Sequence, residues 1–266
     1  RPDEMHSAFN FHYMKGPWEA GALREVIDET MESLADVGAP ATWVLSSHDE
    51  VRLATRYGRP TTSSAHFADG QGEVSDLVLG TRRARAAALL MLALPGCAYI
   101  YQGEELGLPQ VEDLPDEMLQ DPAFLRSGGE TRGRDGCRVP LPWSGTEPPF
   151  GFSPPGVTPW LPQPQEWASL TAEAQAADSD STLSMYRDAL RLRREVPGFV
   201  GSDFAWRSAP DGVVEFERGD GVRCVVNLAA EPYDLGPDSQ VLLSSIPLAD
   251  GKLPTDATGW LGPQRG

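Results

Sequence analysis

Two pairs of ionisable residues directly follow short uncharged runs and are the first candidates for chemistry. His48 and Asp49 come after the run ATWVLS, and Glu104 and Glu105 come shortly after the run CAYIY. Strands buried in a parallel sheet read as such runs, and the side chains that follow them face a pocket at the sheet edge. Both pairs are therefore expected at one edge. The alternative for His48 and Asp49 is a hydrogen-bonded pair that caps the strand end.

Elements that would position these pairs alternate along the first hundred residues. Periodicity predicts a strand at 8–14, a helix at 22–34, a strand at 41–46, a helix at 78–94 and a strand at 97–101. This alternation indicates an α/β protein with a parallel sheet, as in a (β/α)8 TIM barrel. A complete barrel needs roughly 250 residues, whereas about three units are present here. The sequence therefore predicts the last part of a barrel.

The second half of the sequence changes character twice. Residues 107–168 are rich in Pro, Gly and Trp and predict a long loop excursion, because the aromatic residues need burial. Residues 181–196 predict a helix. Short β-rich runs at 212–217, 223–228 and 240–246 then predict antiparallel strands. We expect two domains: a barrel portion over 1–200 and a small β-sandwich-like domain over 201–266.

Composition excludes several classes of partner. The formal net charge is −17, which disfavours nucleic acid and membrane surfaces. The three cysteines, an odd number without metal-type spacing, argue against a disulfide framework or a zinc site and favour a reducing cytoplasm. We find neither a signal peptide pattern nor an apolar run long enough to cross a bilayer. The lack of an initiating Met before Arg1 indicates a sequence entered midway.

Three motifs in order resemble the alpha-amylase family, glycoside hydrolase family 13, and its α-glucosidase and oligo-1,6-glucosidase branch. They are WVLSSHDEVRLATRYG at 43–58, IYQGEELGLP at 100–109 and GRDGCRVPLPW at 133–143. The opening RPDEMHSAFNFHYM is similar to the segment that leads into the family's sixth strand. The resemblance implies that the chain covers about strands six to eight of the barrel, followed by the antiparallel β domain.

Site residues follow from this resemblance position by position. Asp49 would be the third catalytic carboxylate, which stabilises the positive charge of an oxocarbenium-like transition state. His48 would bind a neighbouring hydroxyl of the same sugar ring. Arg134 would complete this substrate-binding set by reaching the hydroxyls or Asp49, since its planar fork suits the task. The alternative for Arg134 is a loop-stabilising salt bridge with Asp135.

Supporting roles are expected for several neighbours. Glu104 and Glu105 make a poor catalytic pair, because adjacent side chains diverge whereas retaining enzymes need carboxyl groups about 5–5.5 Å apart. We expect Glu104, Arg52 and Asp135 to support the loops around the site. Arg52, like Arg56, could instead neutralise Asp49.

Aromatic residues and Cys137 complete the set of candidates. Tyr101, Trp143 and Trp160 could stack on sugar rings, although such aromatics more often belong to the core. Cys137 is expected to be inert, because nothing beside it in the sequence would activate a thiolate. No metal site and no cofactor are expected.

The sequence thus predicts the C-terminal part of a retaining α-glucosidase acting on short malto- or isomalto-oligosaccharides. The family's nucleophilic Asp and acid/base Glu would both precede Arg1, so the chain by itself is expected to be inactive. Ser47 replaces the family's usual Asn. The alternatives are a non-catalytic relative that binds sugars or a protein partner, and a transglycosylase or trehalose-forming isomerase. Linkage preference and oligomeric state stay open.

Overall fold

The computed structural model describes residues 8–35, 38–63, 73–154, 156–237 and 239–263. Residues 1–7 of the opening motif therefore lie outside the described residues. Two compact units divide the chain. Unit 1 comprises residues 1–45, 82–99 and 187–266, and unit 2 comprises residues 46–81 and 100–186. The predicted domain boundary near residue 201 stays a prediction.

Unit 1 begins with two helices, and the first of them corrects the sequence analysis. The predicted strand at 8–14 is instead the short helix α1 (Phe11–Lys15). The side chain of Asn10 accepts a hydrogen bond from the backbone N–H of Tyr13 at 2.9 Å and so caps the helix. Tyr13 is buried and meets the Trp43 ring edge-on, with centroids 5.0 Å apart. The aromatic spacing thus reflects packing on a helix. The next helix, α2 (Ala20–Ala35), matches its prediction.

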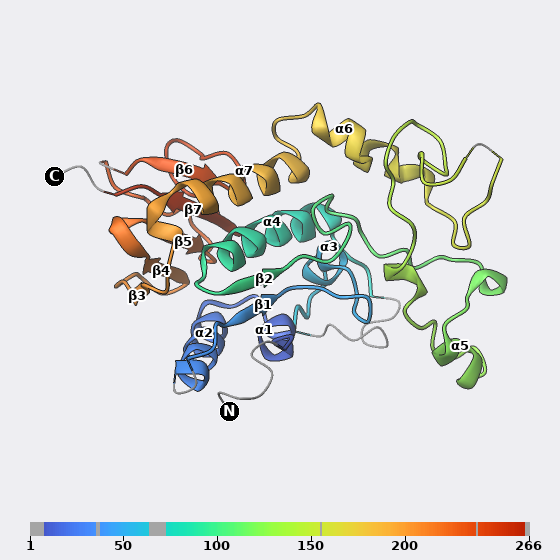
Figure 1. The fold of residues 1–266 in the computed structure, drawn as a ribbon, viewed down its shortest axis with the longest axis horizontal. Helices are drawn as coiled ribbons and strands as arrows, with labels where there is room; N and C mark the ends of the chain where they lie inside the picture. The colour runs from blue at the N-terminus through green and yellow to red at the C-terminus, as the bar shows by residue number, and fades with distance from the viewer. Residues whose placement is uncertain (1–7, 36–37, 64–72, 155, 238, 264–266) are drawn as a thin grey trace. The chain divides into compact units, whose positions relative to one another are not determined.

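A two-stranded parallel sheet follows. Strand β1 (Thr42–Val44) pairs with β2 (Cys97–Tyr99), and helix α4 (Leu77–Ala93) lies between them in the sequence (Figure 1). This is one parallel β-α-β unit, as predicted. Strand β1 is fully buried, but the side chains of Cys97 and Tyr99 are exposed, so the expectation of a buried second strand is wrong. Within the described residues β2 pairs only with β1.

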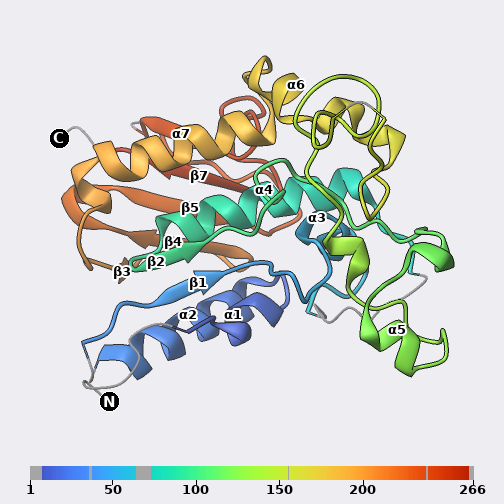
Figure 2. The same cartoon turned by 45° about the vertical axis from the view of Figure 1, so that its right-hand side comes forward.

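The rest of unit 1 is a five-stranded antiparallel sheet in the order β3-β4-β5-β7-β6 (Figure 2). Its strands are β3 (Ala205–Trp206), β4 (Val213–Glu217), β5 (Arg223–Asn227), β6 (Val241–Ser244) and β7 (Ala257–Leu261), with 3-10 helices η4 (Pro197–Phe199) and η5 (Gly219–Gly221) nearby in the sequence.

The three predicted β runs correspond to β4, β5 and β6. Strand β7 was not predicted, although it lies inside the sheet and is buried along its whole length. Side chains of this strand join the sheet to α4. The Thr258 hydroxyl donates to the Ala86 carbonyl at 2.8 Å, and the Trp260 indole donates to the Leu89 carbonyl at 3.0 Å. Side-chain hydrogen bonds from β7 to backbone carbonyls of α4 therefore help to hold the sheet against the helix.

Unit 2 contains the loops that carry the candidate site. Helix α3 (Leu53–Tyr57) follows His48 and Asp49 in the chain. The predicted excursion contains only short helices: η1 (Asp116–Met118), α5 (Pro122–Arg126), η2 (Asp135–Cys137) and η3 (Gln165–Leu170), after which come α6 (Ala172–Ala176) and α7 (Thr182–Glu195).

The excursion has its own apolar core. Among its described residues, nine side chains are buried in this core, namely Leu108, Val111, Leu114, Leu119, Val139, Leu141, Phe150, Leu161 and Trp167, and Leu106 and Leu183 join them from either side of the segment. Burial of this size explains how a segment without long helices or strands is held in place. Among the described residues, no helix combines the length and apolarity that a membrane span requires.

Candidate active site

His48 and Asp49 occupy a turn in the segment that follows β1. The backbone N–H of Asp49 donates to the Ser47 hydroxyl at 3.2 Å, and that of Glu50 donates to the Ser47 carbonyl at 3.4 Å. Ser47 is buried, whereas the side chains of His48 and Asp49 are 61% and 45% exposed. The turn therefore exposes the His48 imidazole and the Asp49 carboxylate to solvent, while the buried Ser47 hydrogen-bonds to the backbone of the turn.

The Asp49 carboxylate is the centre of a charged cluster. Arg134 Nη1 lies 2.8 Å from Asp49 Oδ1, and Arg138 Nη2 lies 3.0 Å from the same oxygen. His48 Nε2 lies 3.3 Å from Asp49 Oδ2. Arg138 Nε also donates to the His48 carbonyl at 2.9 Å. Residues almost ninety positions apart in the sequence thus hold one carboxylate while leaving part of it open.

Asp121 completes the cluster from beneath, and the sequence analysis missed it. Its side chain is 0% exposed and takes Arg134 in a two-pronged contact, with Nε 2.6 Å from Oδ2 and Nη2 3.2 Å from Oδ1. Hydrogen bonds to Asp121 and then to Asp49 raise the pKa of Arg134, so this guanidinium stays charged. The only sequence signal was local: Asp-Pro is a typical start for a short helix, and Asp121 does cap α5 through the N–H of Ala123.

Asp135 does not pair with Arg134, so the alternative reading of Arg134 as its salt-bridge partner is wrong. Instead, Asp135 Oδ2 accepts hydrogen bonds from the backbone N–H groups of Gln120 and Asp121, at 2.6 and 2.8 Å. It therefore fixes the loop that carries Asp121. The two side chains point in different directions. That of Arg134 contacts Asp49 and Asp121, whereas that of Asp135 is buried and contacts the backbone of Gln120 and Asp121.

Glu104 is buried and lies apart from these contacts. Its Oε1 accepts from the Tyr186 hydroxyl at 2.7 Å, and its Oε2 accepts from the Ser46 hydroxyl. Burial outweighs these hydrogen bonds and raises the pKa of the carboxyl group. Glu105 accepts instead from the backbone N–H of Gly103 at 2.8 Å. The two neighbouring carboxylates therefore serve different contacts, and the supporting role of Glu104 stays a prediction.

Arg52 points to the loop after β2. Its Nη1 donates to the Gln102 carbonyl at 3.0 Å, and its guanidinium lies over the Tyr101 ring at 5.4 Å. The side chain is buried, and within the described part of the chain its Nε and Nη2 have no hydrogen-bond partner. Desolvation accordingly lowers its pKa. Arg56 is fully buried beside the Tyr57 ring. These contacts favour the loop-holding role of Arg52 over neutralisation of Asp49.

The remaining candidates fall into two groups. Trp143 and Trp160 are 50% and 47% exposed, so of the two alternatives the core reading does not hold for them, and stacking on sugar rings stays a prediction. Tyr101 is half-buried and donates to the Cys137 carbonyl at 3.0 Å. Cys137 is buried, and desolvation raises the pKa of its thiol to about 11, which opposes thiolate chemistry at neutral pH.

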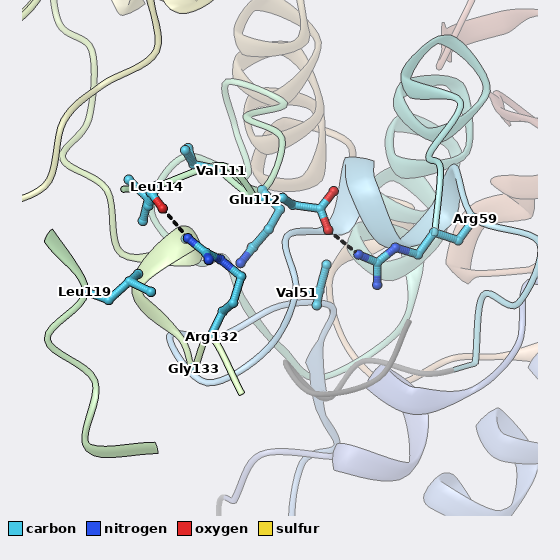
Figure 3. Close-up of a pocket in the computed structure, with 10 residues that line it drawn as sticks. Val51, Arg59, Val111, Glu112, Leu114, Leu119, Arg132 and Gly133 are labelled. Atoms are coloured by element: carbon cyan, nitrogen blue, oxygen red, sulfur yellow. Dashed lines mark hydrogen bonds and ion pairs between the residues drawn. The ribbon is translucent and has the colours of Figure 1, made fainter. Parts of the chain in front are cut away.

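Two cavities are lined by residues other than His48, Asp49 and Arg134. In unit 2, a cavity of about 70 Å³ is lined by Gly133 and Gly136, which flank Arg134 and Asp135 in the chain (Figure 3). It is far smaller than the roughly 300–1,000 Å³ of small-molecule sites. Figure 3 shows its two arginines already engaged: Arg59 pairs with Glu112 at 2.6 Å, and Arg132 donates to a backbone carbonyl.

A cavity of about 700 Å³ lies in unit 1. Its lining is mostly apolar or small and contains no charged residue: Met31, Leu34, Ala35, Gly38, Ala39, Pro40, Ala41, Pro95, Gly96, Cys97, Gly201 and Ser202. It offers space but no acid or base. No group of three or more residues suited to metal ligation occurs among the described residues. The cluster around Asp49, by contrast, brings charged side chains together at a partly exposed carboxylate.

Known proteins identify the family of this chain. Residues 3–200 match the model of the alpha amylase catalytic domain. A probable alpha-glucosidase of Rhizobium meliloti is 34% identical over 195 residues, which cover 72% of this chain and 32% of that protein. Maltase A1 of Drosophila melanogaster is 28% identical over 259 residues, covering 91% of this chain and 40% of the maltase. The chain therefore belongs to the alpha-amylase family of glycoside hydrolases.

Solved structures agree with this assignment. The crystal structure of an alpha-glucosyl transfer enzyme matches 97% of this chain and 46% of its own, with a TM-score of 0.73 and 27% identity. The structural neighbours are family members built on a (β/α)8 barrel, and the parallel β1-α4-β2 unit fits that fold. The chain spans about a third to two fifths of the curated relatives' length, so which barrel strands it supplies stays a prediction.

Proposed function

We propose that this chain supplies the sugar-holding side of an α-glucosidase active site, with Asp49 as the group that stabilises the transition state. The observation that carries the proposal is the convergence of Arg134 and Arg138 on one oxygen of a carboxylate that is still 45% exposed. An open carboxylate can accept hydrogen bonds from sugar hydroxyls, and the guanidinium groups beside it can donate to hydroxyls of the same ring. His48, 61% exposed beside it, adds a further group to the same surface.

The chemistry assigned to Asp49 is electrostatic. Cleavage of a glycosidic bond builds positive charge on the anomeric carbon and ring oxygen. A fixed carboxylate stabilises that charge without having to reorganise during the reaction. The retaining mechanism also needs a nucleophile and a proton donor about 5–5.5 Å apart. Glu104 is buried against Tyr186 and Ser46, so we propose that neither the nucleophile nor the proton donor is Glu104 and that both come from other carboxyl groups of the active enzyme.

The substrates we propose are short α-linked gluco-oligosaccharides. Support comes from the curated relatives, which include a probable alpha-glucosidase, a maltase and an oligo-1,6-glucosidase. Glucosyl transfer rather than hydrolysis is the second candidate, favoured by the match to an alpha-glucosyl transfer enzyme. The two differ in whether water or a second sugar receives the glucosyl group, so product analysis of an active form with maltose separates them.

Turnover is the test of this function. We expect the 266-residue chain to release no nitrophenol above background from p-nitrophenyl α-glucopyranoside. In a longer form that does turn over, Asp49→Asn should lower kcat by about 10²–10³-fold, because it removes charge but little volume. Near-normal turnover in Asp49→Asn would sink the role of Asp49. Hydrolysis at enzymatic rates by the 266-residue chain would contradict the proposal that two further carboxyl groups are required.

A further inference from the structure

Asp121 is fully buried, and its carboxylate accepts most of its hydrogen bonds from Arg134. Besides the two-pronged contact with the Arg134 side chain, its Oδ2 accepts from the Arg134 backbone N–H at 3.0 Å, and its Oδ1 accepts from the Ala123 N–H at 2.8 Å. Arg138 Nη1 lies 3.7 Å from the same Oδ2. Burial alone would raise the pKa of Asp121, but the hydrogen bonds from Arg134 and Ala123 lower it to about 2.

The local backbone is shaped around this carboxylate. Gly133 adopts a left-handed conformation with φ of 73°, and a Cβ at this position would lie 2.6 Å from the Cβ of Asp121. Asp135 holds the backbone N–H of Asp121 from the other side. A buried charge without such partners would cost several kcal/mol. The loop therefore accommodates Asp121 as an ion in a fixed position.

The ionised carboxylate of Asp121 also contributes to the charge balance around Asp49. Asp49 has two guanidinium groups within 3.0 Å of one oxygen. Two positive charges against one negative charge would oppose a developing cation on a bound sugar. Asp121 supplies the second negative charge, so the set of two aspartates and two arginines is neutral. Arg134 is shared between the two carboxylates, and 45% of the Asp49 side chain stays exposed.

We propose that Asp121 is a positioning residue of the sugar site: it fixes Arg134 on Asp49 and offsets the charge of the two arginines, so that Asp49 favours a cationic sugar ring. The proposal rests on the proposed function, because it concerns the same Asp49 surface. It extends that function by naming the residue on which discrimination between a cationic and a neutral sugar depends.

The test compares two monosaccharide probes on the 266-residue chain and its Asp121→Asn variant. The first is 1-deoxynojirimycin, a glucose-like imino sugar used below the pKa of its ring nitrogen and therefore cationic. The second is glucose, which is neutral. Isothermal titration gives both dissociation constants. Exchange of the Arg134 Nε–H with water, followed by ¹⁵N NMR without ligand, reports directly on the contact between Arg134 and Asp121.

We expect Asp121→Asn to weaken imino sugar binding at least about tenfold more than glucose binding, which corresponds to about 1.4 kcal/mol. The Arg134 Nε–H should exchange about tenfold faster or more, since the charge-assisted hydrogen bond is lost. The matched control is Asp116→Asn on the same excursion, which removes a 71%-exposed carboxylate paired with Arg132 at 2.8 Å. It should change neither the affinity ratio nor the exchange rate.

Each contrary result has a distinct meaning. A variant that stays folded by circular dichroism and keeps the wild-type affinity ratio contradicts the proposal alone. Unchanged exchange at Arg134 contradicts the clamp itself. Should the wild-type chain bind neither probe, the sugar site of the proposed function fails, and the proposal that depends on it fails with it.

Discussion

Two arginines, Arg134 in unit 2 and Arg218 in unit 1, are used in opposite ways. In unit 2, Arg134 contacts Asp49 and Asp121, and these hydrogen bonds raise its pKa. In unit 1, Arg218 is buried and donates to backbone carbonyls, including that of Ala93 at the end of α4, and burial lowers its pKa to about 10. Arg193 likewise donates to the carbonyls of Leu92 and Gly96.

The comparison separates an arginine that stabilises the fold from an arginine that can serve a ligand site. The last carbonyls of a helix lack partners within the helix and carry partial negative charge, so a guanidinium satisfies them without any acidic residue. In that arrangement the guanidinium donors and the carbonyl acceptors bond to each other, so they are not available to a ligand. A carboxylate shared by two arginines at the surface keeps oxygen lone pairs facing solvent. The first arrangement stabilises the fold, and the second can act on a substrate.

The largest stability effect is expected where the arginine serves only the fold. Arg218→Met removes the donor from the carbonyls of Ala93, Phe199, Gly201 and Asp203, and the hydrogen bonds to the first two of these are buried. Each unsatisfied buried group costs about 1–3 kcal/mol, so we expect the free energy of unfolding to fall by about 3 kcal/mol or more. Urea unfolding followed by circular dichroism measures it.

Arg191→Met is the control for this prediction. Arg191 is 50% exposed and pairs with Asp188 and Glu195 on the surface of α7. Exposed pairs of this kind contribute about 0–1 kcal/mol. Equal losses in Arg191→Met and Arg218→Met would contradict the role of Arg218 at the end of α4.

An intermediate effect with a defined pH dependence is expected at Asp121. Its folded pKa of about 2 lies below the reference value of 3.8, so its ionisation stabilises the fold above about pH 4 and ceases to do so as the pH falls to 2. The difference in unfolding free energy between wild type and Asp121→Asn should therefore be about 2 kcal/mol larger at about pH 5 than at about pH 2. A pH-independent difference between the two chains would show that the carboxylate is not held as an ion.

The smallest effect is expected at Ser47. Ser47→Ala removes the acceptor of the Asp49 N–H and should lower the free energy of unfolding by about 0.5–1.5 kcal/mol. Ser47→Asn should restore most of it, because an Asn side chain makes the same kind of turn. Urea unfolding of both variants checks the prediction, and a loss in Ser47→Asn as large as in Ser47→Ala would count against it.

How much of the fold could be predicted depended on periodicity. Helices α2, α4 and α7 carry long helical patterns and were predicted within a few residues. Helix α1 was missed because the run AFNFHYM at 8–14, which alternates aromatic or apolar with polar residues, fits a strand equally well, and the decisive cap from Asn10 is a single residue. Strand β7 was missed because ATGWL contains no alternation. It is buried on both sides, so burial rather than pattern determines its place.

Whether a site residue could be predicted likewise depended on a sequence pattern, here on whether the residue lies in a recognised motif. Motifs identified His48, Asp49 and Arg134 as candidates, and the structure brings all three together, while their catalytic roles stay predictions. Asp121 lies outside those motifs, and nothing in a sequence shows that a carboxylate on a loop will be fully buried beneath an arginine. Arg138 lies within a motif but was not singled out. Its relevance emerges from the direction that η2 gives to two arginines four residues apart.

The most direct test of the account is to titrate ¹⁵N-labelled 266-residue chain with maltose and to map the backbone amides whose signals shift. We predict that the shifts concentrate at residues 47–50 and 134–138 and disappear in Asp49→Asn. Shifts confined to the lining of the cavity in unit 1, or shifts that persist unchanged in Asp49→Asn, would contradict the claim that the cluster around Asp49 is the sugar site.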